Sequence, residues 1–235
     1  MTLALTLADS DSVWLEEFSR GFFEAADEYQ LVLVGGDTTR GSETVVSVHV
    51  IGDVEPDKAM TRAGAKPGDA IYVSGTVGDA AAGLSILQSG LPNSDDVDYL
   101  LNRFRRPQAR IVLGAALSTV AHAAIDLSDG LYTDLEKLLA ASGVAGKFEL
   151  SDIPLSPQLT NLMDEEDALR FALSGGDDYE LCFTAGAADD QMREITSSSG
   201  VPITRIGQAT AGSGLRCTRN GDPYHYQDAG YRHFQ

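Results

Sequence analysis

The pattern of apolar and polar positions predicts a strand, a helix and two more strands at the start of the chain. Leucines alternate with other residues from Leu3 to Leu7, which is typical of a strand with one buried face. Aromatic side chains recur every four residues from Trp14 to Phe22, so we expect a helix over residues 12–29 that packs this aromatic face into the core. Two further apolar runs predict strands over residues 31–34 and 44–54.

Glycine and proline interrupt this pattern near residues 63–68, and beyond them strands and helices alternate. We expect strands over residues 70–75, 147–150, 203–209 and 214–218, a short strand opening 123–130 and another within 174–184. We expect helices over residues 79–88, 97–103, 107–122, 131–142 and 188–198, and two short ones between 156 and 172. The alternation favours an α/β or α+β fold in two lobes, residues 1–62 and 63–235.

Charge and composition exclude several classes of protein. The chain has 235 residues and a formal net charge of −18, which disfavours nonspecific binding to nucleic acid. No run reaches the roughly 18 apolar residues of a membrane span, and no secretory signal is apparent at the start. Cys182 and Cys217 are too few for a disulfide framework. We therefore expect a cytoplasmic globular protein that binds neither nucleic acid nor membrane.

Three turns rich in glycine, carboxylates and hydroxyls adjoin predicted strands. They cover residues 35–41 (GGDTTRG), 126–130 (DLSDG) and 174–180 (SGGDDYE). Glycine lets a backbone approach a ligand closely, and carboxylate and hydroxyl oxygens suit hard cations. For each turn taken alone, helix capping or turn formation is the favoured explanation. Three such turns at strand ends favour a binding site.

The residue types in these turns point to magnesium if the ligand is a polyphosphate. The chain lacks the G-x-x-x-x-G-K-[ST] phosphate loop, so no loop lysine is available to neutralise phosphate. Two like charges about 4 Å apart repel by about 4 kcal/mol at an effective dielectric constant near 20. Divalent cations must therefore lie between the carboxylates and the phosphates, and Mg²⁺ is the cation that this donor set favours.

Five motifs, in order along the chain, resemble those of the thiamine-monophosphate kinase family. They are LVGGDTTRG, RAGAKPGD with YVSGTVGDAAAGL, AIDLSDGLYTDL, ALSGGDDYELCFT and the terminal GYRHF. The resemblance implies a two-lobed α/β (α+β) architecture shared with aminoimidazole-ribonucleotide synthetase and selenophosphate synthetase. It also implies transfer of the γ-phosphoryl group of ATP to thiamine monophosphate, with several Mg²⁺ ions, by a homodimer.

The resemblance also implies roles for individual residues. Gly36 and Asp37 correspond to an ATP-contacting pair, and Arg62 corresponds to an arginine that contacts the nucleotide phosphates. The expected Mg²⁺ ligands are Asp37, Asp126 and Asp129, and Ser128 is a further ATP contact.

The same motifs supply candidate contacts to the acceptor substrate. An acidic residue of the SGGDDYEL turn is expected to hold the substrate, either Asp177 or Glu180, with Glu180 favoured. Tyr231 matches an aromatic residue near the thiamine moiety, and its ring would face the cationic thiazolium. No catalytic base is assigned, because the attacking phosphate oxygen is already ionised near neutral pH.

Members of this family begin with a segment that carries an early Gly-Asp-Asp stretch, an Asp-rich strand and part of the dimer interface. The chain is therefore expected to be N-terminally truncated, with residues 1–62 forming a partial ATP-binding and dimerisation lobe. Two alternatives to an active kinase remain open: a non-catalytic fragment that binds Mg²⁺ or nucleotide, and another ATP-dependent synthetase of the same superfamily.

Two other features have ordinary structural explanations. Arg103, Arg105 and Arg106 form the only basic cluster and are expected to make surface salt bridges. Asp79, flanked by glycine at the start of a predicted helix, is expected to be a helix cap.

Overall fold

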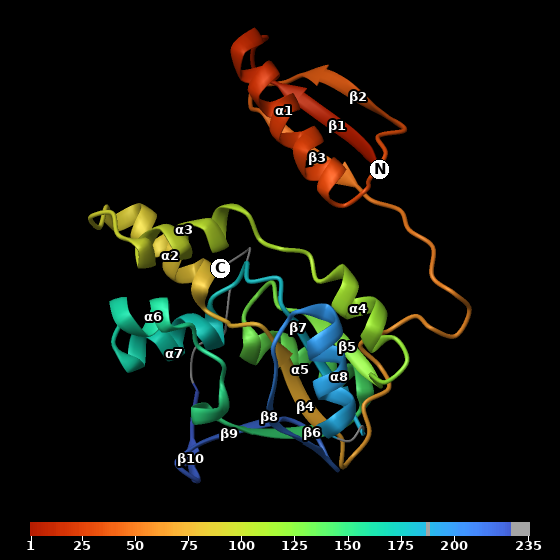
Figure 1. The fold of residues 1–235 in the computed structure, drawn as a ribbon, viewed down its shortest axis with the longest axis vertical. Coiled ribbons are helices and arrows are strands. Elements are labelled where there is room, and N and C mark those ends of the chain that lie inside the picture. The colour runs from red at the N-terminus through yellow and green to blue at the C-terminus, as the bar shows by residue number, and fades with distance from the viewer. Residues whose placement is uncertain (187–188, 227–235) are drawn as a thin grey trace. The chain divides into compact units, whose positions relative to one another are not determined.

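A computed structural model describes residues 1–186 and 189–226 of the chain. The chain divides into two compact units, residues 1–56 and residues 57–235 (Figure 1). None of the described helices is long and apolar enough to cross a membrane.

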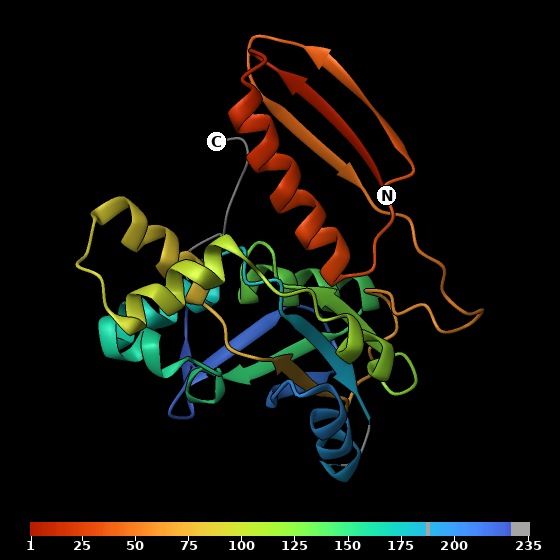
Figure 2. The same ribbon diagram turned by 45° about the horizontal axis from the view of Figure 1, so that its top comes forward.

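The first unit combines one helix with a three-stranded sheet. Its elements are β1 (Thr2–Leu7), α1 (Ser12–Glu28), β2 (Gly35–Arg40) and β3 (Val45–His49). The strand order is β2-β1-β3, with β1 parallel to β2 and antiparallel to β3. Helix α1 begins where the Asp11 carboxylate accepts hydrogen bonds from the backbone N–H groups of Val13 and Trp14, and it runs along the sheet (Figure 2).

Two sequence predictions for this unit are wrong. Residues 31–34 form no strand, and Val32 and Val34 are 70% and 76% exposed. The strand is instead β2, formed by the glycine-rich segment that was predicted as a turn. Gly36 pairs with Leu3, and a Cβ at Gly36 would clash with the Leu3 carbonyl oxygen, so the lack of a side chain permits this close pairing.

The aromatic face of α1 is also less buried than its spacing predicts. The rings of Trp14 and Phe18 stack with centroids 5.1 Å apart, and Phe22 continues the stack at 5.9 Å. Trp14 nevertheless remains 39% exposed. A small three-stranded sheet covers too little of the helix to bury the whole stripe, so the rings pack mainly on one another.

The second unit is built around a seven-stranded sheet with strand order β10-β9-β6-β8-β4-β7-β5. Its strands are β4 (Ala70–Ser74), β5 (Ala123–Asp126), β6 (Ala145–Glu149), β7 (Leu181–Ala185), β8 (Ile203–Thr210), β9 (Leu215–Arg219) and β10 (Asp222–Tyr224). All neighbouring strands are antiparallel except β6 and β9, which are parallel. The interior strand β4, between β8 and β7, is buried along its whole length.

Helices cover both faces of this sheet. On one face α5 (Leu131–Ser142) packs Leu135 and Leu138 against Ile71 and Val73 of β4. On the other, α4 (Ile111–Leu117) and α8 (Asp189–Ser199) pack against Tyr72 of β4 and its neighbours. Successive side chains of β4 therefore enter different cores, as expected for a strand buried on both faces.

A separate apolar cluster forms among the remaining helices. These are α2 (Asp79–Ser89), α3 (Asp95–Arg105), α6 (Pro157–Leu162) and α7 (Glu165–Ser174), and a 3₁₀ helix (Leu150–Asp152) precedes α6. Ile86, Leu100 and Leu159 are fully or almost fully buried among them. This cluster fixes the start of α2 and the end of α7, which flank the polar turns described next.

Candidate functional site

Two of the three acidic turns pair with each other at one end of the seven-stranded sheet. The turn after β5 and the turn before β7 are joined by three backbone hydrogen bonds. Asp177 N–H donates to the Ser128 carbonyl (3.2 Å), Tyr179 N–H to the Leu127 carbonyl (2.9 Å), and Leu127 N–H to the Glu180 carbonyl (2.8 Å). Because β5 and β7 are antiparallel neighbours, the end of one strand meets the start of the other. Sheet topology therefore brings the DLSDG and SGGDDYE segments together.

Glycines allow the two turns to approach each other. A Cβ at Gly176 would clash with the Ser128 carbonyl oxygen, and a Cβ at Gly130 would clash with the backbone of Leu173 and Ser174. Gly130 also has a φ of 110°, which L-amino acids with a side chain rarely adopt. The glycines of the motifs thus serve the packing of one turn on the other.

The SGGDDYE turn holds two residues in the left-handed region. Asp177 has φ 68° and Tyr179 has φ 50°, although neither is glycine. A left-handed conformation costs roughly 1–2 kcal/mol for such residues, so the surrounding hydrogen bonds must hold it. The Tyr179 hydroxyl donates to the Asp177 carboxylate over 3.2 Å.

Three carboxylates surround Tyr179 in this arrangement. Burial raises the pKa of Tyr179, and the negative charges of Asp177, Asp126 and Asp129 raise it further. Asp126 is exposed, and within residues 1–186 and 189–226 its carboxylate makes no hydrogen bond or ion pair. Asp129 is half-buried and lies 2.5 Å from the ammonium group of Lys137. Sequence reasoning selected Asp126, Asp129 and Asp177, and the structure brings them together.

Asp134 shapes the DLSDG turn and was not anticipated from the sequence. Its buried carboxylate accepts hydrogen bonds from the backbone N–H groups of Ser128 (3.0 Å) and Asp129 (2.8 Å). Lys137 pairs with it at 2.9 Å. A carboxylate in the first turn of α5, five residues after Asp129, is the only signal that could have identified it.

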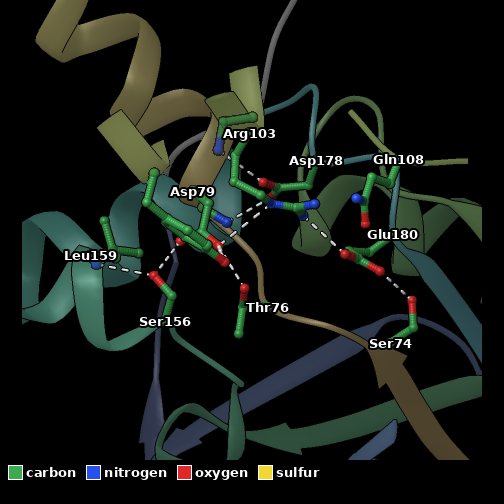
Figure 3. A network of polar contacts seen from close by, with 12 residues as sticks. Ser74, Thr76, Asp79, Arg103, Gln108, Ser156, Leu159, Asp178 and Glu180 are labelled. Atoms are coloured by element: carbon green, nitrogen blue, oxygen red, sulfur yellow. Dashed lines mark hydrogen bonds and ion pairs between the residues drawn. The ribbon is translucent and has the colours of Figure 1, made fainter. Parts of the chain in front are cut away.

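Glu180 occupies a different environment from Asp177. It is fully buried, and its carboxylate accepts hydrogen bonds from the side chains of Arg103, Arg110 and Ser74 (Figure 3). Arg110 binds both carboxylate oxygens. This carboxylate is therefore committed to arginines inside the unit, whereas Asp177 is only half-buried at the paired turns.

Asp178 lies between Asp177 and Glu180 in the sequence and caps helix α2. Its carboxylate accepts from the backbone N–H groups of Gly78 (2.6 Å) and Ala80 (3.1 Å) at the start of α2. Burial raises the pKa of Asp178 to about 7, and the neighbouring Asp79 adds to the rise, although the two backbone hydrogen bonds oppose it. Asp178 thus anchors the SGGDDYE turn to the start of α2. Glu180 anchors it to Arg103 of α3 and to Arg110, which directly precedes α4.

Two expectations about charged residues are wrong. Asp79 is not the helix cap, because that position is taken by Gly78 and the capping carboxylate is that of Asp178. Asp79 is instead fully buried and accepts hydrogen bonds from Ser156 and Thr76 (Figure 3). Arg103 is not a surface residue, because α3 turns it inward to Glu180 and Asp79.

Four further residues selected from the sequence are not part of the paired turns: Gly36, Asp37, Arg62 and Tyr231. Gly36 and Asp37 are on the exposed strand β2 of the first unit, where the Asp37 carboxylate accepts from the backbone N–H of Thr38. The backbone of Arg62 accepts a hydrogen bond from Ser142, at the far end of α5 and roughly 17 Å along that helix from Leu131. The structure therefore does not bring Arg62 to the paired turns. Tyr231 lies outside the described residues.

The paired turns have donors suited to Mg²⁺ together with a phosphate. Within the part of the chain that the structure describes, no group of three or more His, Cys, Asp or Glu residues could hold a metal by itself. Mg²⁺ usually takes only one or two carboxylates and completes its shell with waters and substrate phosphates. The unpaired carboxylate of Asp126, with Asp129 in the same turn, fits that requirement.

Comparison with known families covers most of the chain. Residues 1–54 match the family described as AIR synthase related protein, N-terminal domain, and residues 66–220 match AIR synthase related protein, C-terminal domain. Thiamine-monophosphate kinase of Escherichia coli K12 is 48% identical over 242 residues, covering 100% of this chain and 73% of that protein. The Haemophilus influenzae enzyme of the same name is 41% identical with the same coverage.

Solved structures agree with the sequence comparison. The thiamine-monophosphate kinase of Stenotrophomonas maltophilia K279a superposes with a TM-score of 0.86 at 41% identity, covering 95% of this chain and 72% of that one. AaThiL complexed with AMPPCP and TMP gives a TM-score of 0.82 at 28% identity, covering 99% and 72%. The predicted two-lobed fold class is confirmed, and the chain belongs to the thiamine-monophosphate kinase family.

Proposed function

We propose that this chain transfers the γ-phosphoryl group of ATP to thiamine monophosphate, giving thiamine diphosphate and ADP. The observation that carries the proposal is the pairing of the DLSDG and SGGDDYE turns, which gathers Asp126, Ser128, Asp129 and Asp177 at one end of the sheet. Family membership supports it, as does the related structure that carries an ATP analogue together with TMP.

Asp126 and Asp129 would hold Mg²⁺ at these turns. A bound Mg²⁺ would neutralise phosphate oxygens that the carboxylates would otherwise repel. Asp134 supports this arrangement because its carboxylate holds the backbone of Ser128 and Asp129 in place. Lys137 balances part of the negative charge when no cation is bound, since it bridges Asp129 and Asp134. Ser128 would contact the nucleotide from the same turn.

We assign the substrate contact to Asp177 rather than to Glu180. Asp177 is accessible at the paired turns, and a carboxylate there would attract the cationic thiazolium ring. Glu180 has no carboxylate oxygen to offer, because Arg103, Arg110 and Ser74 occupy both. Gly36, Asp37 and Tyr231 keep their predicted roles in this proposal, whereas Arg62 is not assigned to the phosphates, because its backbone lies beside Ser142 at the other end of α5.

The chemistry requires positioning and charge neutralisation from the protein. A phosphate oxygen of thiamine monophosphate forms a bond to the γ-phosphorus, and the bond between that phosphorus and the β–γ bridging oxygen breaks, so that ADP leaves. The attacking oxygen is already ionised near neutral pH, so no side chain has to remove a proton. The left-handed conformations of Asp177 and Tyr179 fix the direction of the carboxylate before substrate arrives.

The chain is further proposed to act as a homodimer. Apolar side chains are exposed on β3 of the first unit, where Val45, Val46 and Val48 are 43–50% exposed. Exposed valines along one strand are typical of an interface. Light scattering of the purified chain should give twice the monomer mass, and a monomer at all concentrations would contradict this part of the proposal.

The proposed reaction is tested by incubating the chain with ATP, Mg²⁺ and thiamine monophosphate and measuring thiamine diphosphate by chromatography. Formation of diphosphate that depends on both ATP and Mg²⁺ is the expected result. Calorimetric binding of Mg·ATP without turnover would favour the non-catalytic alternative. ATP turnover that requires another acceptor would favour a different synthetase of the superfamily. If the chain neither binds Mg·ATP nor forms thiamine diphosphate, the assignment is refuted.

A further inference from the structure

A polar cavity lies in the second unit, and the accessible carboxylates of the paired turns, Asp126, Asp129 and Asp177, do not line it. Its volume is about 350 Å³, and among the described residues that line it Glu180 is the one acidic side chain. Arginines from α3 and from the segments that follow it contribute most of the charge: Arg103, Arg106 and Arg110. Asn102 and Gln108 also line it.

The cavity carries excess positive charge in a strongly acidic chain. Glu180 is shared between two arginines, because Arg103 Nη2 lies 2.9 Å from it and Arg110 donates to both of its oxygens. Asp79 offsets part of the charge of Arg103, whose Nε lies 3.7 Å from it. Arg106 is exposed and, within the described part of the chain, forms no ion pair. Its guanidinium therefore adds a positive charge that no carboxylate of residues 1–186 or 189–226 pairs with.

Most of the polar side chains at this cavity can donate hydrogen bonds. The Gln108 amide oxygen accepts from Arg110 Nη1 over 3.2 Å, and its amide nitrogen remains a donor (Figure 3 labels Gln108). The oxygens of Glu180 are likewise engaged, and Arg106 can only donate. A cavity that offers arginine and amide donors, and whose one lining carboxylate among the described residues is already engaged, suits an anion, and arginine matches phosphate oxygens in geometry.

We propose that this cavity binds a small phosphate-bearing anion, with Arg106 as its principal free contact. The inference goes beyond the proposed kinase reaction and does not depend on it. The paired turns need a divalent cation to hold phosphate, whereas the arginine cavity supplies positive charge by itself. Phosphate binding at the paired turns should therefore require Mg²⁺, whereas phosphate binding in the arginine cavity should not.

The test is calorimetric titration of inorganic phosphate into the whole chain at low ionic strength in the presence of EDTA. Wild type should bind phosphate, and Arg106→Gln should bind it about tenfold more weakly or worse, since a hydrogen bond to a charged group contributes roughly 1.5–3 kcal/mol. Arg105→Gln is the matched control, because Arg105 is exposed on the same helix and does not line the cavity. It should bind phosphate as wild type does.

Glycerol phosphate, titrated in parallel, distinguishes an organic phosphate from free inorganic phosphate as the natural occupant of the cavity. Tighter binding than that of inorganic phosphate would identify an organic phosphate as the occupant, and equal binding would identify free phosphate. The proposal is overturned if wild type binds no phosphate in EDTA, or if the Arg105 and Arg106 variants weaken binding equally. Both side chains are exposed, so both variants should fold.

Discussion

Asp177 and Glu180 show how burial separates two carboxylates only three positions apart. Asp177 lies at the paired turns with a tyrosine hydroxyl as its partner, whereas Glu180 is enclosed by two arginines and a serine. A carboxylate that is fully engaged inside a unit stabilises the fold, and an accessible one is free to bind a ligand. The two residues should therefore respond differently to loss of charge.

We expect Asp177→Asn to weaken binding of thiamine monophosphate about tenfold, because an interaction with a charged group contributes roughly 1.5–3 kcal/mol. Stability in urea should change little, since Asp177 is only half-buried. Glu180→Gln should instead lower the free energy of unfolding by about 3–5 kcal/mol, because it removes the buried negative charge that Arg103 and Arg110 share. Calorimetry and urea unfolding measure the two effects, and unchanged substrate affinity in Asp177→Asn would contradict the assignment.

Asp178 predicts a specific dependence of stability on pH. Its pKa of about 7 in the folded state lies above the ordinary value of 3.8, so between these values the folded chain holds a proton that the unfolded chain has released. The contribution of Asp178 to stability is therefore largest below about pH 4, falls as pH rises to about 7, and then levels off.

Asp178→Asn tests this dependence. Asparagine keeps the shape but cannot titrate, and at low pH it resembles the protonated carboxyl, which likewise offers one carbonyl oxygen to the start of α2. The free energy of unfolding of wild type should therefore fall relative to that of the variant as pH rises from 4 to 7. A difference that stays constant in chemical denaturation across that range would contradict a raised pKa.

At the scale of elements, the site depends on how closely two turns pack. Gly176 and Gly130 lie where a side chain would meet the backbone of the opposite turn. The hydrogen bonds between the turns hold Asp177 in its left-handed conformation, so any separation of the turns should also misplace its carboxylate. The packing of the two turns and the binding of a ligand by Asp177 therefore depend on the same backbone hydrogen bonds.

Gly176→Ala should therefore lower both stability and affinity for Mg·ATP, because the new methyl group would clash with the Ser128 carbonyl. Overpacking of this kind costs typically 1–3 kcal/mol. Gly114→Ala is the control: Gly114 lies within α4 and an added Cβ would meet only ordinary contacts, so helix propensity should make that variant neutral or slightly more stable. Equal thermal stabilities for the two variants would show that the turns do not need to approach this closely.

The elements of the second unit could be predicted well, because their patterns are local. Alternation and helical spacing place β4, α2 and α5 within a residue or two of where they lie. In the first unit, the apolar run 31–34 misled the prediction, since the strand that pairs with β1 is chosen by close backbone approach at Gly36 rather than by hydrophobicity.

At the scale of the whole molecule, motifs could identify which residues gather but not which are accessible. Asp126, Asp129 and Asp177 come together because β5 and β7 are neighbours, a pairing that no local pattern reveals. The inward turn of Arg103, the capping by Asp178 and the support from Asp134 depend on contacts across many positions in the chain. The position of each side chain on its helix and its burial determine these roles, and the charge of a residue in the sequence predicts neither.

The central claim is that acidic turns hold the triphosphate of ATP only through magnesium. Calorimetric titration of ATP with Mg²⁺ and with EDTA tests it directly in wild type, in Asp126→Asn/Asp129→Asn and in Arg106→Gln. We predict that Mg²⁺ raises the affinity of wild type and of Arg106→Gln for ATP at least about tenfold, and that the double variant loses this increase. Equal affinity of wild type for ATP with Mg²⁺ and with EDTA, or an undiminished magnesium effect in the double variant, would contradict the claim.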